Sequence, residues 1–245
     1  MDLALAASVG KRLVDPLLAV VFPSACPACG QLLTQIGRGP LCEPCWSALP
    51  RHAQLPCGCG LPLVPGISAC PRCRRGRQVF AAGSSLGPYE GSLRVAVHAL
   101  KFSGRRRAAA RFAELLLESE PVARLLATSD VIVAVPLHPR RLRERGFNQA
   151  ALLAHELASR ARRPCCPDAL VRRVDTAPQA GLSAAARRRN VRAAFAVRRK
   201  ASVAGKTVTL VDDVVTTGAT ALACGRELIA AGAREVRLVS VARVA

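Results

Sequence analysis

The sequence has few aromatic residues and no long apolar run. Its 245 residues include only 6 Phe, 1 Trp and 1 Tyr, which leaves little material for a channel that binds single strands by stacking bases. The best candidate for a membrane span, residues 13–22, is interrupted by Asp15 and Pro16 and is far shorter than the roughly 18 residues required. Lys11 and Arg12 follow the first short apolar stretch, which is the wrong order for a signal peptide. We therefore expect a cytoplasmic protein without membrane insertion.

Lysine is also scarce, although the chain is strongly basic. The formal net charge is +20, and the 36 basic residues include only Lys11, Lys101, Lys200 and Lys206 as lysines. Such a charge suggests an anionic partner, but a bias toward Arg and Ala can also reflect genome base composition. The charge is concentrated in residues 90–200, so we expect an anion to bind the middle of the chain.

Cysteine, in contrast, is abundant and clustered. Cys26 and Cys29 form one Cys-x-x-Cys pair, and Cys42 and Cys45 form another after a gap of twelve residues. Each pair is typical of a tight turn whose amides point at the sulfurs, and two such turns supply four thiolates to one tetrahedral zinc ion. The spacing predicts a structural zinc site, with redox-active dithiols as the alternative.

Four further cysteines predict a second zinc site. Cys57 and Cys59 form a pair that is one residue shorter than Cys-x-x-Cys, and Cys70 and Cys73 form a standard pair. Neither predicted site offers an open coordination position or a nearby base, so both are expected to be structural.

The rest of the chain alternates between predicted strands and helices. We expect strands at residues 131–135, 193–198, 207–211 and 236–242, and helices at 92–102, 148–163 and 219–231. This alternation predicts an α/β fold with a mainly parallel sheet. We therefore divide the chain into residues 1–80, an amino-terminal helix with a double zinc ribbon, and residues 81–245, the α/β domain.

The sharpest motif follows the predicted strand at residues 207–211. Asp212 and Asp213 come first, and small hydroxyl residues then lead into a helix: Thr216, Thr217, Gly218, Ala219 and Thr220. Backbone amides at a helix N-terminus bind phosphate, and a glycine permits close approach and a positive φ angle. Carboxylates beside a phosphate would repel the ligand unless they bind hydroxyl groups. The 2′- and 3′-hydroxyls of ribose meet that requirement, so the motif predicts a ribose 5-phosphate site.

Residues 208–220 resemble the phosphoribosyl pyrophosphate (PRPP) motif of type I phosphoribosyltransferases. The resemblance extends to the ComF (ComF/GntX) family of competence-associated proteins, which pair a double zinc ribbon with such a domain. It covers residues 18–243 and departs from the family pattern only at Cys57-x-Cys59. The matching stretches are the cysteine pairs, Ala99-Leu100-Lys101-Phe102, residues 135–149, Gln179-Ala180-Gly181-Leu182 and Arg187-Arg188-Arg189-Asn190-Val191.

The resemblance implies a type I phosphoribosyltransferase-like fold and roles for the basic segments. Residues 137–141 match the pyrophosphate loop, so Arg140 or Arg141 would contact pyrophosphate. Residues 175–192 match a lid, which would bring Arg187 and Arg188 over the ligand. Lys101 is a weaker candidate for the same group, and a solvated surface position is the alternative for each arginine.

Three functions remain open at this point. The resemblance implies a protein that binds magnesium-bound PRPP and assists the uptake or processing of single-stranded DNA in natural transformation, together with competence-machinery proteins. The alternatives are a phosphoribosyltransferase acting on a nitrogen acceptor and a PRPP sensor without turnover. No cluster of aromatic or amide residues indicates a base-binding shelf, and no catalytic residue can be assigned. DNA binding through the phosphate backbone fits the composition better than base stacking.

Overall fold

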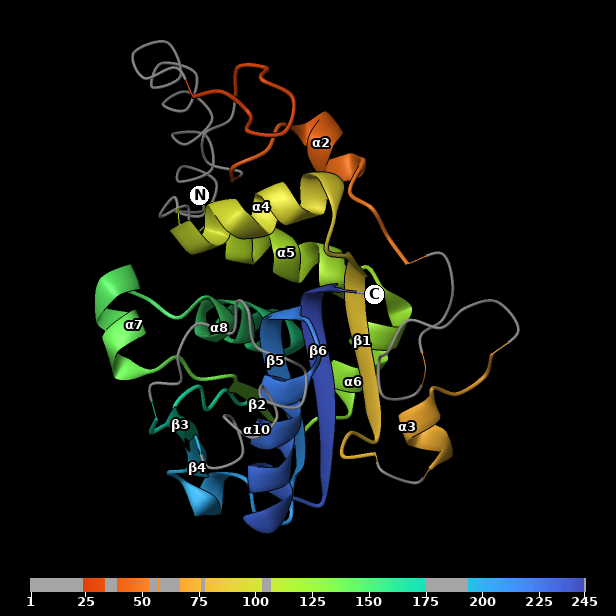
Figure 1. The fold of residues 1–245 in the computed structure, drawn as a ribbon, viewed down its shortest axis with the longest axis vertical. Helices are drawn as coiled ribbons and strands as arrows, with labels where there is room; N and C mark the ends of the chain where they lie inside the picture. Colours follow the sequence, from red (N-terminus) through yellow and green to blue (C-terminus); the bar gives the residue numbers. More distant parts are fainter. Residues whose placement is uncertain are drawn as a thin grey trace, which may run out of the picture.

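A parallel four-stranded sheet forms the centre of the molecule (Figure 1). This computed structural model describes residues 24–33, 39–52, 57, 67–75, 78–102, 107–174 and 194–244. The strand order is β1-β6-β5-β2, with bounds Ala82–Pro88 for β1, Glu235–Arg243 for β6, Thr207–Val215 for β5 and Val131–Ala134 for β2. The expected α/β fold with a parallel sheet is confirmed.

Helices cover both faces of this sheet. Figure 1 shows α10 (Ala219–Ala230) in front of it and α6 (Glu120–Ala127) and α8 (Gln149–Ala161) behind it. Helix α5 (Ala108–Leu117) packs against α8 and α6. The remaining elements are α2 (Glu43–Ser47), α3 (Pro71–Arg74), α4 (Gly91–Phe102), α7 (Pro139–Arg145), η2 (Lys200–Ser202) and an antiparallel pair, β3 (Leu170–Arg172) with β4 (Phe195–Val197).

The first strand was not predicted, because its residues are typical of turns. β1 has the sequence Ala-Gly-Ser-Ser-Leu-Gly-Pro and nevertheless pairs in parallel with β6. Its small residues are needed where another segment crosses it: a Cβ on Gly87 would lie 1.9 Å from the carbonyl oxygen of Pro50. The amino-terminal segment therefore packs directly on the strand.

The amino-terminal cysteine segment shares its core with the sheet domain. The fully buried Trp46 packs edge-to-face on Phe112 of α5, with ring centroids 5.2 Å apart. At the rim of this contact, Arg111 of α5 donates to Glu43 of α2 at 2.6 Å. The two parts of the chain on either side of the predicted boundary at residue 80 are thus in close contact.

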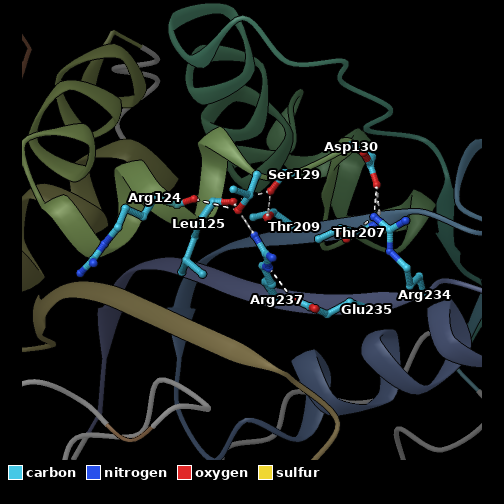
Figure 2. A network of polar contacts seen from close by, with 10 residues as sticks. Arg124, Leu125, Ser129, Asp130, Thr207, Thr209, Arg234, Glu235 and Arg237 are labelled. Carbon is cyan, nitrogen blue, oxygen red and sulfur yellow. Dashed lines mark hydrogen bonds and ion pairs between the residues drawn. The ribbon is translucent and has the colours of Figure 1, made fainter.

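A polar network holds together the edge of the sheet at which its strands begin (Figure 2). Asp130, just before β2, accepts hydrogen bonds from the Thr207 amide and from Arg234, each at 2.8 Å. The amide of Thr207 is the main reason why the pKa of Asp130 is lowered, and the charge of Arg234 contributes as well. Arg237 of β6 donates to the carbonyl of Leu125 at 3.0 Å. These contacts hold the connection between α6 and β2 against β5 and β6.

No helix within the described ranges is long and apolar enough to cross a membrane.

Candidate functional site

The acidic pair lies inside strand β5, where sequence reasoning placed it just after a strand. The strand continues to Val215, because Val214 and Val215 pair with Ala242 and Arg243 of β6. Pairing with β2 ends earlier, at Ala134 and Val211. Beyond that point the carboxylates of Asp212 and Asp213 accept hydrogen bonds from the next backbone amides, at 2.9 and 2.8 Å. The two carboxyl groups are therefore held rigidly at the carboxyl edge of the sheet.

Both carboxyl groups are buried, with 8% of Asp212 and 4% of Asp213 exposed. Lys101, in the last turn of α4, places its Nζ 2.9 Å from Oδ2 of Asp213. Burial raises the pKa of Asp212 well above its usual range, and the neighbouring charge of Asp213 raises it further, while Lys101 opposes the shift. Because charged carboxylates are costly to bury, this arrangement is maintained at the expense of stability, which is typical of a ligand site.

Asp212→Asn should therefore stabilise the ligand-free protein at neutral pH. A carboxyl group whose pKa is raised on folding favours the native state below its unfolded pKa of about 3.8 and loses that contribution as pH rises through the higher native value. The neutral amide avoids this loss. We expect the midpoint of thermal unfolding at pH 7–8 to rise in the variant, whereas at pH 4 the difference should shrink. A lower midpoint at pH 7–8 would contradict this account.

A short loop, residues 216–218, follows the acidic pair and leads into α10. Thr216 and Thr217 are exposed, and Gly218 adopts φ +72° at the N-cap of α10, which a glycine adopts without strain. The Gly218 carbonyl accepts the Leu222 amide at 2.8 Å, so the helix begins immediately after the loop. The first-turn amides of an α-helix point out of its N-terminus and favour an anion there.

The segment after β2 is shorter than the predicted pyrophosphate loop. Only residues 135–138 are irregular, because α7 begins at Pro139 and thus includes Arg140 and Arg141. Pro139 is favourable in the first turn of a helix, and His138 caps it by accepting the Arg140 amide at 3.3 Å. Asn148, the predicted N-cap of α8, donates to the Val135 carbonyl at 3.0 Å and accepts the Ala150 amide at 3.0 Å. This amide side chain positions the end of β2.

The arginines of α7 differ in their exposure. Arg140 is exposed and forms an ion pair with Glu144 at 3.0 Å. Arg145, which sequence reasoning did not single out, is half-buried and donates to Gln149 at 2.8 Å. Burial lowers the pKa of Arg145, while the charge of Asp213 acts in the opposite direction. Arg145 therefore lies close enough to Asp213 for the two charges to interact.

Arg243 and His52 lie at the β6 and β1 ends of the same edge. Arg243 ends β6 and is only 8% exposed. Its Nη2 lies 4.0 Å from the position that a Cβ of Gly218 would occupy. His52 shares a hydrogen bond with Ser85 of β1 at 2.8 Å, and its pKa is lowered by burial and by the charge of Arg243. Only the register of β6 against β5 could have revealed Arg243, since nothing in its local sequence marks it.

The first cysteine cluster is assembled as its spacing predicts. The Sγ atoms of Cys26, Cys29, Cys42 and Cys45 all lie within 4.8 Å of one another. Burial opposes ionisation of Cys26, but hydrogen bonds from the amides of Cys42, Ala28 and Cys29 outweigh it and lower its pKa to about 6. Amides directed at a thiolate are the environment expected of a zinc-binding turn, so this cluster can hold a metal ion.

The second cluster brings together Cys57, Cys70 and Cys73, whose sulfurs are also within 4.8 Å of one another. The Cys70 amide donates to the Cys57 sulfur at 3.3 Å. Cys59, the predicted fourth ligand, lies outside the described residues. Arg187 and Arg188, the predicted lid at 175–192 and the predicted amino-terminal helix do so as well.

This chain matches one domain family and several known relatives. The phosphoribosyl transferase domain family matches residues 145–245. DNA utilization protein YhgH of Salmonella typhimurium (strain LT2) is 35% identical over 227 residues, which cover 91% of this chain and 99% of that protein. Competence protein F of Haemophilus influenzae (strain Rd) is 30% identical over 213 residues, covering 85% and 92%.

Solved structures show weaker similarity. The allosteric regulatory enzyme of purine biosynthesis aligns with a TM-score of 0.33 and 22% identity, over 54% of this chain and 25% of that chain. Phosphoribosylpyrophosphate synthetase from Mycobacterium smegmatis aligns with a TM-score of 0.31 and 17% identity, over 68% and 56%. This chain therefore spans about a quarter of the first enzyme and about half of the second.

Proposed function

The chain belongs to the ComF family, with DNA utilization protein YhgH and competence protein F, and we propose that its phosphoribosyl transferase domain binds magnesium-bound PRPP. One observation carries the proposal: a buried pair of carboxyl groups lies at the end of a single strand, and a short loop leads from there into the N-terminus of a helix. Ligands of parallel α/β folds bind at this edge of the sheet. The family relationship extends the proposal to a role in the uptake or processing of single-stranded DNA, with competence-machinery proteins as partners.

Each part of the ligand has a complementary group. Asp212 and Asp213 would accept hydrogen bonds from the ribose hydroxyls, and residues 216–220 would bind the 5-phosphate. Lys101 would leave Asp213 when the hydroxyls arrive and turn toward the pyrophosphate, together with Arg145 or Arg141. The lid arginines Arg187 and Arg188 would close over the ligand.

Two metals belong to this proposal. Carboxylate and phosphate oxygens are the ligands that magnesium prefers, and the buried acidic pair fits that preference; when bound, magnesium neutralises charge on the pyrophosphate. Zinc in the first cysteine cluster would be structural, because four thiolates leave no open coordination position. The three sulfurs of the second cluster, with Cys59 as the predicted fourth, fit a second zinc.

A calorimetric titration of the full chain with PRPP, with and without magnesium, tests the proposal. We expect a dissociation constant in the micromolar range that requires magnesium, and no comparable binding of pyrophosphate alone. Release of pyrophosphate on addition of a nitrogen nucleophile would identify a transferase, and binding without turnover would identify a sensor. Absence of magnesium-dependent binding would refute the proposal.

Single-stranded DNA should bind without sequence preference and with strong salt dependence. Figure 1 shows α7, which is one of the basic segments, and β4, which directly precedes the basic residues 198–200, toward the left of the view. Log affinity should fall with log salt concentration by about 0.7 for each phosphate contacted. Replacement of Arg105, Arg106 and Arg107 by Ala should make this slope shallower and leave PRPP affinity unchanged.

The control is Arg124→Ala on α6, an exposed arginine outside these segments. It should behave like the parent protein. If the positive charge only reflects the base composition of the genome, DNA binding at physiological salt will be negligible, and the triple variant will not differ from the parent.

A further inference from the structure

A cavity of about 260 Å³ lies on the side of α10 and adjoins residues 216–220, the proposed phosphate loop. Its apolar lining consists of Val79, Phe80, Leu222 and Leu238, with Pro71 and with Cys70 of the second cysteine cluster beside them. Thr217, Gly218 and Arg243 line its polar part. Neither Asp212 nor Asp213 is among the described residues that line this cavity. The cavity is therefore distinct from the ribose site, although both adjoin the phosphate loop.

The polar end of the cavity is suited to a phosphate. Arg243 is more than nine-tenths buried, and its guanidinium approaches Gly218 at the N-terminus of α10. A phosphate on the loop would therefore meet helix amides on one side and a guanidinium on the other. Charge-assisted contacts of this kind are stronger than neutral hydrogen bonds, and a buried guanidinium is preorganised to form them.

The apolar wall is packed closely against α10. A Cβ on Gly225 of α10 would lie 2.8 Å from Val79 Cγ1 and 2.9 Å from Phe80 Cε1, so residues 79 and 80 pack directly on the helix backbone. Gln78, an exposed residue that also lines the cavity, offers an amide donor and acceptor for a ring edge. The volume lies just below the roughly 300–1,000 Å³ of ligand pockets, so the cavity suits a ring rather than a whole nucleotide.

We propose that this cavity binds the base of a nucleoside 5′-phosphate whose phosphate lies between the loop and Arg243. The ligand is either a free mononucleotide or the 5′-phosphorylated end of a DNA strand. The inference rests on the proposed function only in using the same loop as a phosphate site. Because one loop serves both ligands, the nucleotide and PRPP compete for it, and the base points away from the acidic pair.

Titrations of the full chain with deoxyadenosine 5′-monophosphate, ribose 5-phosphate and PRPP test this inference. The mononucleotide should bind at least about tenfold more tightly than ribose 5-phosphate, since each ~55 Å² of apolar ring surface buried is worth roughly tenfold. It should also displace PRPP. Equal affinity for the mononucleotide and ribose 5-phosphate would overturn the inference and leave the proposed function intact. If the protein binds the mononucleotide but does not bind PRPP, the proposed function is refuted and this inference stands.

Two matched variants separate the sites. Val79→Phe fills the cavity and should weaken mononucleotide binding at least about tenfold while leaving PRPP and ribose 5-phosphate unaffected. Asp212→Asn with Asp213→Asn should weaken PRPP only. If Val79→Phe does not fold, Gln78→Ala replaces it, because this side chain is exposed. Gln78→Ala should weaken the binding of the mononucleotide alone. If neither cavity variant changes mononucleotide affinity, the base does not lie there.

Oligonucleotides distinguish the two sources of the ligand. At high salt, where backbone contacts are weak, a 5′-phosphorylated strand should compete with the mononucleotide and a 5′-hydroxyl strand should not, if a DNA end is the ligand. Competition by the mononucleotide alone identifies a free nucleotide. Equal competition by both strands would show that the 5′-phosphate is not recognised.

Discussion

Removal of bound metal should unfold the amino-terminal cysteine region, residues 26–73. Four thiolates around one zinc ion contribute about 10–16 kcal/mol of apparent binding free energy, more than so short a segment could replace by burying apolar surface. The four sulfurs within 4.8 Å would otherwise bring like charges together. We expect metal analysis to find one to two zinc ions per chain, and chelation to abolish amide protection in this region.

The loss should spread beyond the cysteines, because Trp46 and Glu43 pack on Phe112 and Arg111 of α5. Cys42→Ser should therefore lower the stability of the whole domain as well. Cys165→Ser is the matched control: it removes a half-buried thiol outside both clusters and should leave zinc content unchanged. A metal-free chain that keeps a folded amino-terminal region would end this interpretation.

Sequence reasoning worked where local chemistry determines the structure. The strands at 131–134 and 207–211 are β-branched and buried, and Asn148 caps α8 as predicted. It failed where a contact distant in sequence decides. β1 has Gly87 where the Pro50 segment crosses it, and α5 and α6 are helices that no motif had marked.

The candidate site shows the same division. The acidic pair and the loop form one continuous motif, so they could be found in the sequence alone. Lys101, Arg145 and Arg243 come from three different elements, and only the packing of α4, the position of α7 and the register of β6 bring them to this edge. Lys101 was a weak candidate in the sequence, yet its ammonium group directly contacts the acidic pair.

Replacement of both carboxylates of the acidic pair should abolish most PRPP affinity without unfolding the protein. Asp212→Asn with Asp213→Asn keeps the shape of both side chains and removes the charge that faces ribose and magnesium. Loss of each charge-assisted hydrogen bond costs about 1.5–3 kcal/mol, so we expect affinity to fall at least about tenfold for each one lost. Calorimetry with PRPP and magnesium measures the change directly.

A matched control and a stability measurement show whether this loss is specific. Asp130→Asn removes a carboxylate at the opposite edge of the sheet and should leave PRPP affinity unchanged. Neutralising Asp212 removes a buried charge and so raises the stability of the folded protein. This gain offsets the stability lost with the ion pair between Lys101 and Asp213. The double variant should therefore stay folded while it loses its ligand, a combination that general destabilisation cannot produce. Unchanged affinity in the double variant would place PRPP elsewhere on the protein.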